Sequence, residues 1–488
     1  MKVVSFLVPF LFGLIGIFSF APFSIKLLLF ISYAYLIYII LYSKEDNFIK
    51  VFLWGIGHWG FGMSWIIVSV YYYGETSIAT SSIIYILLVI ILSLVFTCPL
   101  LLIRVFLNSF KINNNFYKSL VVSSLLMLGE FSRYYLLNGV PWLIPGNIYL
   151  DTITQNIYPF FGVSFSSLLI YLLCSNIVIS YHDKKRYYLI IFFILVTIFP
   201  NHKEINNIND GIQVSIVQPS SDPFLKYKSD YYNQIERNLL DLISSTSDKS
   251  ELIVLPEAEL PYLINSNRFE EFLKRASQTD KLVMGGWYID NNLIYNSIFS
   301  IKSGDLYKKN HLVPFGEYIP FISGLRGIIG FFDLPMSNVS QGGSDQPNII
   351  INETISLATP ICFDIAFPNT VRKMNKSSLL MINISNDTWF GNSIGPYQHL
   401  SITRIRSIEN NRWSIRSTND GISALISNNG TIVTKLEKGV SGILEGKVGL
   451  IKENSLYNMY GYLVTYFFCF IILIITFFNF LCQKYYPK

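Results

Sequence analysis

Residues 252–261 read LIVLPEAELP, and residues 355–364 read ISLATPICFD. In each stretch a short run of apolar residues ends at a proline, and a chemically reactive side chain, Glu257 or Cys362, follows within two positions. Short apolar runs bounded by turn residues are typical of buried strands. The two stretches therefore predict strands that deliver a carboxylate and a thiol to their ends.

The residues around these stretches alternate between strand and helix patterns. Strands are predicted at Ile212–Gln218, Leu252–Leu255, Lys281–Ile289, Leu293–Ile301, Ile355–Ile361, Leu379–Ile384 and Ser414–Ile426. Helices are predicted at Lys228–Ser245, Arg268–Ser277 and about Pro396–Arg412, and a hairpin turn at Asn429-Gly430. The pattern predicts one α/β domain over residues 211–450.

Both flanks of this domain are far more apolar than its interior. The 488-residue chain is 51% hydrophobic and only 14% charged, which is typical of a membrane protein. Runs that can cross about 30 Å of hydrocarbon occupy Val4–Phe23, Leu27–Tyr42, Val51–Tyr72, Ile83–Ile103, Ser119–Leu137, Tyr158–Ser180 and Leu456–Leu481. The shorter run Tyr187–Pro200 also fits an interfacial helix. We expect a polytopic α-helical bundle of about seven spans in residues 1–200 and an eighth span at 455–482.

The distribution of Lys and Arg predicts how these spans are oriented. The basic segments are Lys2, Ser43–Lys50, Arg104–Lys118 with Lys111, Asp183–Arg186, and the tail with Lys484 and Lys488. The intervening loops Tyr73–Ser77 and Asn138–Thr154 carry neither Lys nor Arg. Both termini are expected in the cytoplasm and the α/β domain on the outer side of the membrane. The net charge of +5 is spread over short loops, so we expect no nucleic-acid partner.

Cys362 is the only cysteine outside the apolar runs, and it has no partner for a disulfide or a zinc knuckle. A thiol needs a base to become a nucleophile, and Glu257 can take its proton. Lys309, in LYKKNHLVPFGEY, would stabilise the thiolate and the oxyanion, with the backbone N–H of Phe363 as a second donor. Each residue alone also fits a structural role. The five histidines lack metal-ligand spacing, so no metal is expected.

The order Glu, Lys, Cys at strand ends resembles the nitrilase, or carbon-nitrogen hydrolase, superfamily, and this resemblance implies an α-β-β-α sandwich. The whole chain resembles the membrane-bound branch of that superfamily, the apolipoprotein N-acyltransferase family. The motifs that carry this resemblance are LPEAELP, YKKNHLVPFGEYIP, PICFD, NISNDTWFG, GPYQHL, RIRSIENNRWSIRSTNDGISALI, FAPF and GHWGFGMSWI.

The resemblance implies a two-step acyl transfer in the bacterial cytoplasmic membrane, with a periplasmic catalytic domain and no cofactor. A phospholipid, expected to be phosphatidylethanolamine, would acylate Cys362. The α-amine of a diacylglyceryl-modified N-terminal cysteine on an apolipoprotein would then accept the chain. Glu257 would act as base and proton donor, and Glu317 in PFGE would orient Lys309.

The chain departs from the family pattern at three positions. Phe363 and Asp364 follow the nucleophile where the family usually has Tyr and Glu, and Tyr227 stands where the family often has Trp. These changes put supporting geometry in doubt but leave the triad intact. Trp389 and Phe390 are expected either to dip into the bilayer and bind substrate or to form a buried loop.

Two other functions fit the sequence. A membrane-tethered nitrilase-type amidohydrolase would pass the acyl group to water, and a non-catalytic relative would only bind lipoproteins. The stretch Gly391–Gly395 matches G-x-S-x-G, but a loop precedes it where a nucleophile elbow needs a strand. Fusion to a helical bundle favours a monomer.

Overall fold

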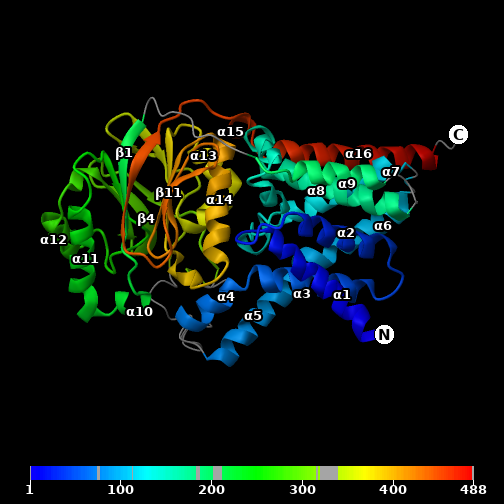
Figure 1. The fold of residues 1–488 in the computed structure, drawn as a ribbon, viewed down its shortest axis with the longest axis horizontal. Coiled ribbons are helices and arrows are strands. Elements are labelled where there is room, and N and C mark those ends of the chain that lie inside the picture. Colours follow the sequence, from blue (N-terminus) through cyan, green and yellow to red (C-terminus); the bar gives the residue numbers. More distant parts are fainter. Residues whose placement is uncertain are drawn as a thin grey trace. The chain divides into compact units, whose positions relative to one another are not determined.

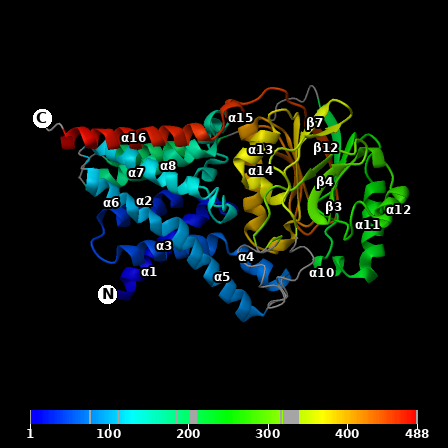
Figure 2. The same cartoon turned by 180° about the vertical axis from the view of Figure 1, so that it is seen from behind.

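The computed structural model describes residues 2–73, 77–110, 112, 114–182, 187–201, 211–314, 317–318 and 339–485. The chain divides into two compact units (Figures 1 and 2). The first contains residues 1–66, 79–202 and 460–488, and the second contains residues 67–78 and 203–459. Residues 67–78 thus group with the second unit, although the sequence predicted them within or next to a membrane span.

The first unit is a helical bundle. Its helices are α1 (Lys2–Ile15), α2 (Leu27–Tyr42), α3 (Asn47–Gly62), α5 (Ile78–Leu92), α6 (Leu102–Phe110), α7 (Asn115–Ser132), α8 (Tyr158–His182), α9 (Tyr187–Thr197) and α16 (Leu463–Tyr485). A Cβ on Gly13 would lie 2.0 Å from the Trp54 carbonyl oxygen, so glycine lets α1 and α3 pack closely. The C-terminal α16 joins the bundle through a 2.8 Å hydrogen bond between the hydroxyls of Thr476 and Tyr117 on α7.

Several helices of the described chain are long and apolar enough to cross a membrane. They are Ile78–Phe110, Ile153–His182 and Leu463–Cys482. A fourth span forms if Asn47–Gly62 and Trp65–Tyr71, which meet at 54°, cross together. The predicted run at Tyr187 is an 11-residue helix. The prediction of eight spans therefore goes beyond what helix length supports. Among the basic residues used for orientation, Lys111, Asp183–Arg186 and Lys488 lie outside the described residues.

Two six-stranded sheets form the second unit, in the orders β12-β1-β2-β3-β4-β5 and β11-β10-β9-β8-β7-β6. The strands of the first sheet are β1 (Gly211–Gln218), β2 (Leu252–Val254), β3 (Leu282–Asp290), β4 (Leu293–Ser300), β5 (Leu306–Lys308) and β12 (Gly442–Gly449). Those of the second are β6 (Ile349–Ile351), β7 (Ile355–Ala358), β8 (Leu380–Ser385), β9 (Ser414–Thr418), β10 (Ser423–Ile426) and β11 (Ile432–Leu436).

The apolar faces of the two sheets pack on each other, with Val214 and Ile216 of β1 in the same buried cluster as Ile382 and Ile384 of β8. Helices α11 (Tyr232–Ser244) and α12 (Asn267–Arg275) cover the first sheet. Helices α13 (Pro368–Met374) and α14 (Gly395–Asn410) cover the second (Figures 1 and 2). The domain is an α-β-β-α sandwich, as the resemblance implied.

One predicted strand was wrong. Ser414–Ile426 is not continuous but forms a hairpin of β9 and β10. The side chain of Ser423 accepts a hydrogen bond from the Thr418 N–H at 3.0 Å and closes the turn at Asn419–Ile422. Asn, Asp and Gly in sequence are strong turn formers, and this signal outweighs the apolar pattern on either side.

Candidate active site

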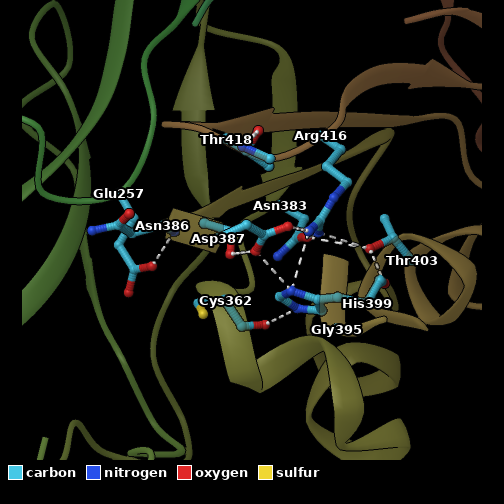
Figure 3. Close-up of polar contacts among 12 residues, drawn as sticks. Glu257, Cys362, Asn383, Asn386, Asp387, Gly395, His399, Thr403, Arg416 and Thr418 are labelled. Atoms are coloured by element: carbon cyan, nitrogen blue, oxygen red, sulfur yellow. Dashed lines mark hydrogen bonds and ion pairs between the residues drawn. The ribbon is translucent and has the colours of Figure 1, made fainter. Parts of the chain in front are cut away.

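The three predicted reactive residues come from the ends of three strands. Glu257 follows β2, Lys309 follows β5, and Cys362 follows β7 and opens the short 3-10 helix η12 (Cys362–Ala366). Lys309 Nζ lies 3.0 Å from Glu257 Oε1. Glu257 and Lys309 are both close enough to Cys362 to shift the pKa of its thiol, and Figure 3 shows the sulfur on the side of Cys362 that faces Glu257.

Three donors hold the buried Glu257 carboxylate. Oε1 accepts hydrogen bonds from Lys309 Nζ and from Asn296 Nδ2 at 2.6 Å. Oε2 accepts one from the Asn386 N–H at 2.7 Å (Figure 3). The backbone at Glu257 runs against Gly285 of β3, where a Cβ would lie 2.7 Å from the Glu257 Cα. The Glu257 carboxylate is therefore fixed both by its hydrogen-bond partners and by a glycine in the neighbouring strand.

Lys309 carries its charge between two carboxylates. Its Nζ lies 2.8 Å from Glu317 Oε1 as well as beside Glu257. Burial alone would lower the pKa of Lys309, but the charges of Glu257 and Glu317 raise it well above its ordinary value. Glu317 is itself held by the Val313 N–H at 2.9 Å. Its contacts agree with the orienting role that the sequence predicts for it, although the neighbouring Phe315 and Gly316 of the PFGE motif lie outside the described residues.

Cys362 has a left-handed backbone, with φ of 46°. Burial raises the pKa of its thiol far above the ordinary value, and the nearby charge of Glu257 raises it further, while Lys309 lowers it. The resting side chain is thus a thiol rather than a thiolate. Nucleophilic attack requires a base at the moment of reaction, and Glu257 is the carboxylate placed to serve.

Asp364, which stands where the family usually has Glu, is held in place by three hydrogen bonds. The buried side chain of Asp364 accepts hydrogen bonds from the Tyr307 hydroxyl at 3.0 Å, the His311 N–H at 2.7 Å and the Ile361 N–H at 3.2 Å. Burial raises the pKa of Asp364 to about 6, although Lys309 and these hydrogen bonds lower it. Asp364 therefore ties the chain after Lys309 to the turn that carries Cys362.

The predicted aromatic residues differ in their surroundings. Phe363 is half-buried and packs edge-on against Phe367, with ring centroids 5.2 Å apart. Tyr227 follows α10 (Pro223–Lys226) and is also half-buried. Phe390 is buried, with its ring centroid 5.8 Å from that of His399, so it fits the buried-loop alternative. Trp389 is half-buried, and its carbonyl accepts a hydrogen bond from Ser69 Oγ at 2.7 Å.

Sequence reasoning missed two groups that hold the Glu257 carboxylate. Asn296 Nδ2 bridges the carboxylates of Glu257 and Glu317, at 2.6 and 2.9 Å, and the Asn386 backbone N–H holds Glu257. The signal for Asn296 was an amide in an otherwise apolar strand, LIYNSIFS, which pointed to a buried polar role. Nothing in the sequence indicated that the Asn386 N–H would reach Glu257, because the two residues are 129 positions apart. In the described part of the chain, no three His, Cys, Asp or Glu residues gather as metal ligands, and metal-free chemistry stays a prediction.

The sequence matches two family models. The Apolipoprotein N-acyltransferase N-terminal domain matches residues 12–176, and Carbon-nitrogen hydrolase matches residues 213–451. A protein of Pasteurella multocida named apolipoprotein N-acyltransferase is 30% identical over 99% of this chain and 97% of its own length. A protein of the same name from Haemophilus influenzae is 29% identical over 95% of this chain and 93% of its own length.

Proposed function

The chain belongs to the apolipoprotein N-acyltransferase family, and we propose that its two acyl transfers run through a thioester on Cys362. The acyl donor is a membrane phospholipid, with phosphatidylethanolamine as the first candidate. The acceptor is the α-amino group of the diacylglyceryl-modified N-terminal cysteine of an apolipoprotein. The observation that carries the proposal is the Glu257 carboxylate, which contacts Lys309 at 3.0 Å and raises the pKa of the Cys362 thiol.

In the first step, Cys362 Sγ attacks the ester carbonyl carbon of the phospholipid while Glu257 takes the thiol proton. The tetrahedral intermediate collapses to the thioester. The lysophospholipid oxygen leaves with the proton that Glu257 returns. In the second step, the amine attacks the thioester carbonyl, Glu257 accepts the proton that the amine loses, and the sulfur of Cys362 leaves and recovers a proton. Atoms and charge therefore balance over the cycle with one carboxylate as shuttle.

Lys309 stabilises negative charge in both steps. Its ammonium compensates the thiolate as it forms, and with the Phe363 N–H it stabilises the oxyanion of each tetrahedral intermediate. Glu317 also contacts the ammonium, at 2.8 Å, and keeps it oriented. Asp364 supports the turn that carries Cys362, through the hydrogen bonds described above. Tyr227, Trp389 and Phe390 are proposed to contact lipid or lipoprotein at the entrance.

The chain is a membrane protein, and we place it in the bacterial cytoplasmic membrane with about eight spans. Both termini are proposed to lie in the cytoplasm, with the carbon-nitrogen hydrolase domain in the periplasm. The apolar helices and the basic loop Ser43–Lys50 support this orientation. A periplasmic position would give the thiol access to lipoproteins that have already crossed the membrane.

An assay with two possible acceptors tests the function. The full chain is incubated with phosphatidylethanolamine and a synthetic S-diacylglyceryl cysteinyl peptide, and products are identified by mass. N-acylated peptide that is absent with Cys362→Ala supports the proposal. Free fatty acid without acylated peptide would instead identify an amidohydrolase-like hydrolase, and no product of either kind would indicate a non-catalytic relative.

A further inference from the structure

A buried network of polar side chains lies behind the main chain of Cys362 and outside the Glu257, Lys309 and Cys362 triad. It consists of Asp387, His399 and Arg416, each no more than 1% exposed (Figure 3). Asp387 Oδ2 and Arg416 Nη2 form an ion pair at 2.6 Å. Burying charged groups costs free energy unless they are fully paired. A fully buried ion pair next to Cys362 therefore indicates a specific role at this position.

The network contacts the main chain of the nucleophile through His399. His399 Nε2 lies 3.1 Å from the carbonyl oxygen of Cys362 (Figure 3). Cys362 is a non-glycine residue in the left-handed region, a backbone conformation that surrounding contacts must hold. The histidine contact is on the peptide unit that follows this strained residue. It therefore restrains the backbone rotation at Cys362 that sets the directions of the Cys362 thiol and the Phe363 N–H.

The chemistry of the partners assigns the role of one ring nitrogen of His399. A carbonyl only accepts, so Nε2 of His399 must carry the proton that bonds Cys362. Nδ1 lies 3.0 Å from Asp387 Oδ1, which only accepts, and 3.1 Å from Arg416 Nη2, which only donates. Burial and Arg416 lower the pKa of His399, although Asp387 opposes this. The ion pair thus contacts Nδ1 and holds the ring whose Nε2–H bonds the nucleophile.

The same segment also reaches the general base. Asp387 directly follows Asn386, whose backbone N–H donates to Glu257 Oε2. Asp387 Oδ1 accepts from Ser385 Oγ at 2.6 Å, which holds the loop at the end of β8. Arg416 lies on β9, in register with Asn383 of β8. One buried ion pair therefore supports the contacts to both the base and the nucleophile.

We propose that His399, Asp387 and Arg416 are positioning residues for the acyl transfer. His399 holds the Cys362 carbonyl so that the thiol faces Glu257, and the Asp387–Arg416 pair holds the His399 ring through its Nδ1 atom. This inference rests on the proposed function, because it assumes Cys362 as the nucleophile. It adds three residues that touch neither substrate nor the reacting sulfur.

The Asp387–Arg416 ion pair also compensates a negative charge near the Cys362 thiol. Asp387 is close enough to raise the pKa of the Cys362 thiol, so its charge must stay compensated. Arg416→Met would leave a buried carboxylate without its cation and should abolish thioester formation on the full chain. Adding Asp387→Asn to that variant removes the unpaired charge and should restore part of the rate, because the two residues are coupled.

The test compares two amides at position 399. In His399→Gln the side-chain N–H can reach the Cys362 carbonyl as Nε2 does, whereas His399→Asn ends near the Nδ1 position and cannot. Thioester formation on the full chain is followed by intact mass with phosphatidylethanolamine in vesicles. We expect Asn to lower the maximal rate by roughly 30- to 100-fold, from a misplaced nucleophile. Gln should stay within about fivefold of wild type, and the phospholipid concentration for half-maximal rate should not change.

His311→Gln is the matched control. The His311 ring stacks on Phe367 at a centroid distance of 3.6 Å and bonds Thr370 Oγ1, so it touches the segment after Cys362 without contacting the Cys362 carbonyl. It should acylate at the wild-type rate. Equal rates for Gln and Asn at position 399, or a wild-type rate for Asn, would overturn the positioning role. Absence of thioester on the wild type would instead overturn the proposed function.

Discussion

At the scale of single residues, the resting state of Cys362 depends on opposing neighbours. Burial and the Glu257 carboxylate raise the pKa of the thiol, and Lys309 lowers it. A neutral thiol resists oxidation and alkylation, because the thiolate is the reactive form. Under the proposed mechanism Cys362 therefore stays unreactive until Glu257 takes its proton during attack on an ester carbonyl.

The raised pKa predicts a distinctive alkylation profile. With iodoacetamide, modification of Cys362 should rise about tenfold per pH unit from pH 7 to 9, because only the thiolate reacts and its fraction is far from saturation. Peptide mass spectrometry measures the rate at Cys362 separately from the other cysteines. A rise of clearly less than tenfold between pH 8 and pH 9, which a thiol of ordinary pKa would give, would contradict the raised pKa.

Removing the base should uncouple thiol reactivity from catalysis. In Glu257→Gln the negative charge that raises the thiol pKa is lost while Lys309 remains, so alkylation at pH 7 should be faster than in wild type. Acyl transfer should nevertheless fall by about 100-fold or more, since no group takes the proton. The two rates are measured on the same preparation. If both fell together, Glu257 would be structural rather than a base.

Asp364 supplies a prediction about pH and stability. Its folded pKa of about 6 lies above the ordinary Asp value of 3.8. The folded state thus favours the protonated carboxyl. This contribution to stability is full below about pH 3.8 and is lost as the pH rises through 6. The stability of wild type relative to Asp364→Asn should therefore increase by about 1 kcal/mol from pH 7 to pH 5.

Thermal unfolding in detergent at the two pH values measures this difference. A stability difference for Asp364→Asn that is the same at pH 5 and pH 7 would show that Asp364 is ionised throughout.

Single residues were predicted where the chemistry is local in sequence. Glu257 and Cys362 each follow a proline at a strand end, and both lie where the pattern predicted. His399 and Arg416 were not predicted to support the nucleophile, because their roles depend on contacts between residues 37 and 17 positions apart. A long-range hydrogen bond of this kind leaves no signal in the local sequence.

At the scale of secondary-structure elements, the position of the base depends on how closely β3 approaches the end of β2. A Cβ on Gly285 would lie 2.7 Å from the Glu257 Cα and 2.8 Å from the Pro256 carbonyl oxygen, both of them backbone atoms. Neither atom can move without displacing the base. The glycine is thus required by the spacing of two strands and not by a turn.

Gly285→Ala should therefore impair catalysis more than folding. The displaced Glu257 should lower the transfer rate by roughly 10- to 100-fold, with a stability loss of about 1–3 kcal/mol from overpacking. Gly343→Ala is the matched control, because nothing lies within 4 Å of its added Cβ. Turnover and thermal unfolding are measured for both variants. Wild-type turnover in Gly285→Ala would refute the tight approach.

Elements were predicted well where the hydrophobic pattern was long. β1, β3, β4 and α14 lie within one or two residues of their predicted bounds. The short β5 and β6 and the charged edge strand β12 were missed, since three residues or a weakly apolar run give no clear period. β12 pairs with β1 along its whole length, so tertiary pairing formed a strand that local sequence did not indicate.

At the scale of the whole molecule, the chain combines apolar helices with an α-β-β-α domain that needs water on its outer surfaces. Composition alone distinguishes the helical bundle from the α/β domain, because the segments on either side of residues 211–450 are apolar and that segment is mixed. The number of spans could not be settled in this way. An apolar run in the sequence does not reveal whether its helix is bent or short. This is the case for α3 with α4 (Trp65–Val68), which form a bent pair, and for the short α9.

The proposed orientation predicts opposite labelling of two thiols. Lys249→Cys, on the exposed surface of the α/β domain, should react with a membrane-impermeant maleimide in intact spheroplasts. The native exposed Cys482, near the C-terminus, should react only after lysis. Labelling is quantified by peptide mass. The reverse pattern would place the catalytic domain in the cytoplasm.

The acyl-enzyme itself is the most direct test of the mechanism. The purified full chain is incubated with phosphatidylethanolamine without acceptor, and its intact mass is measured before and after addition of hydroxylamine. We predict a gain of one acyl group that maps to Cys362, disappears with hydroxylamine and is absent from Cys362→Ala. Wild-type protein that stays unmodified while it still acylates an S-diacylglyceryl peptide would contradict the thioester.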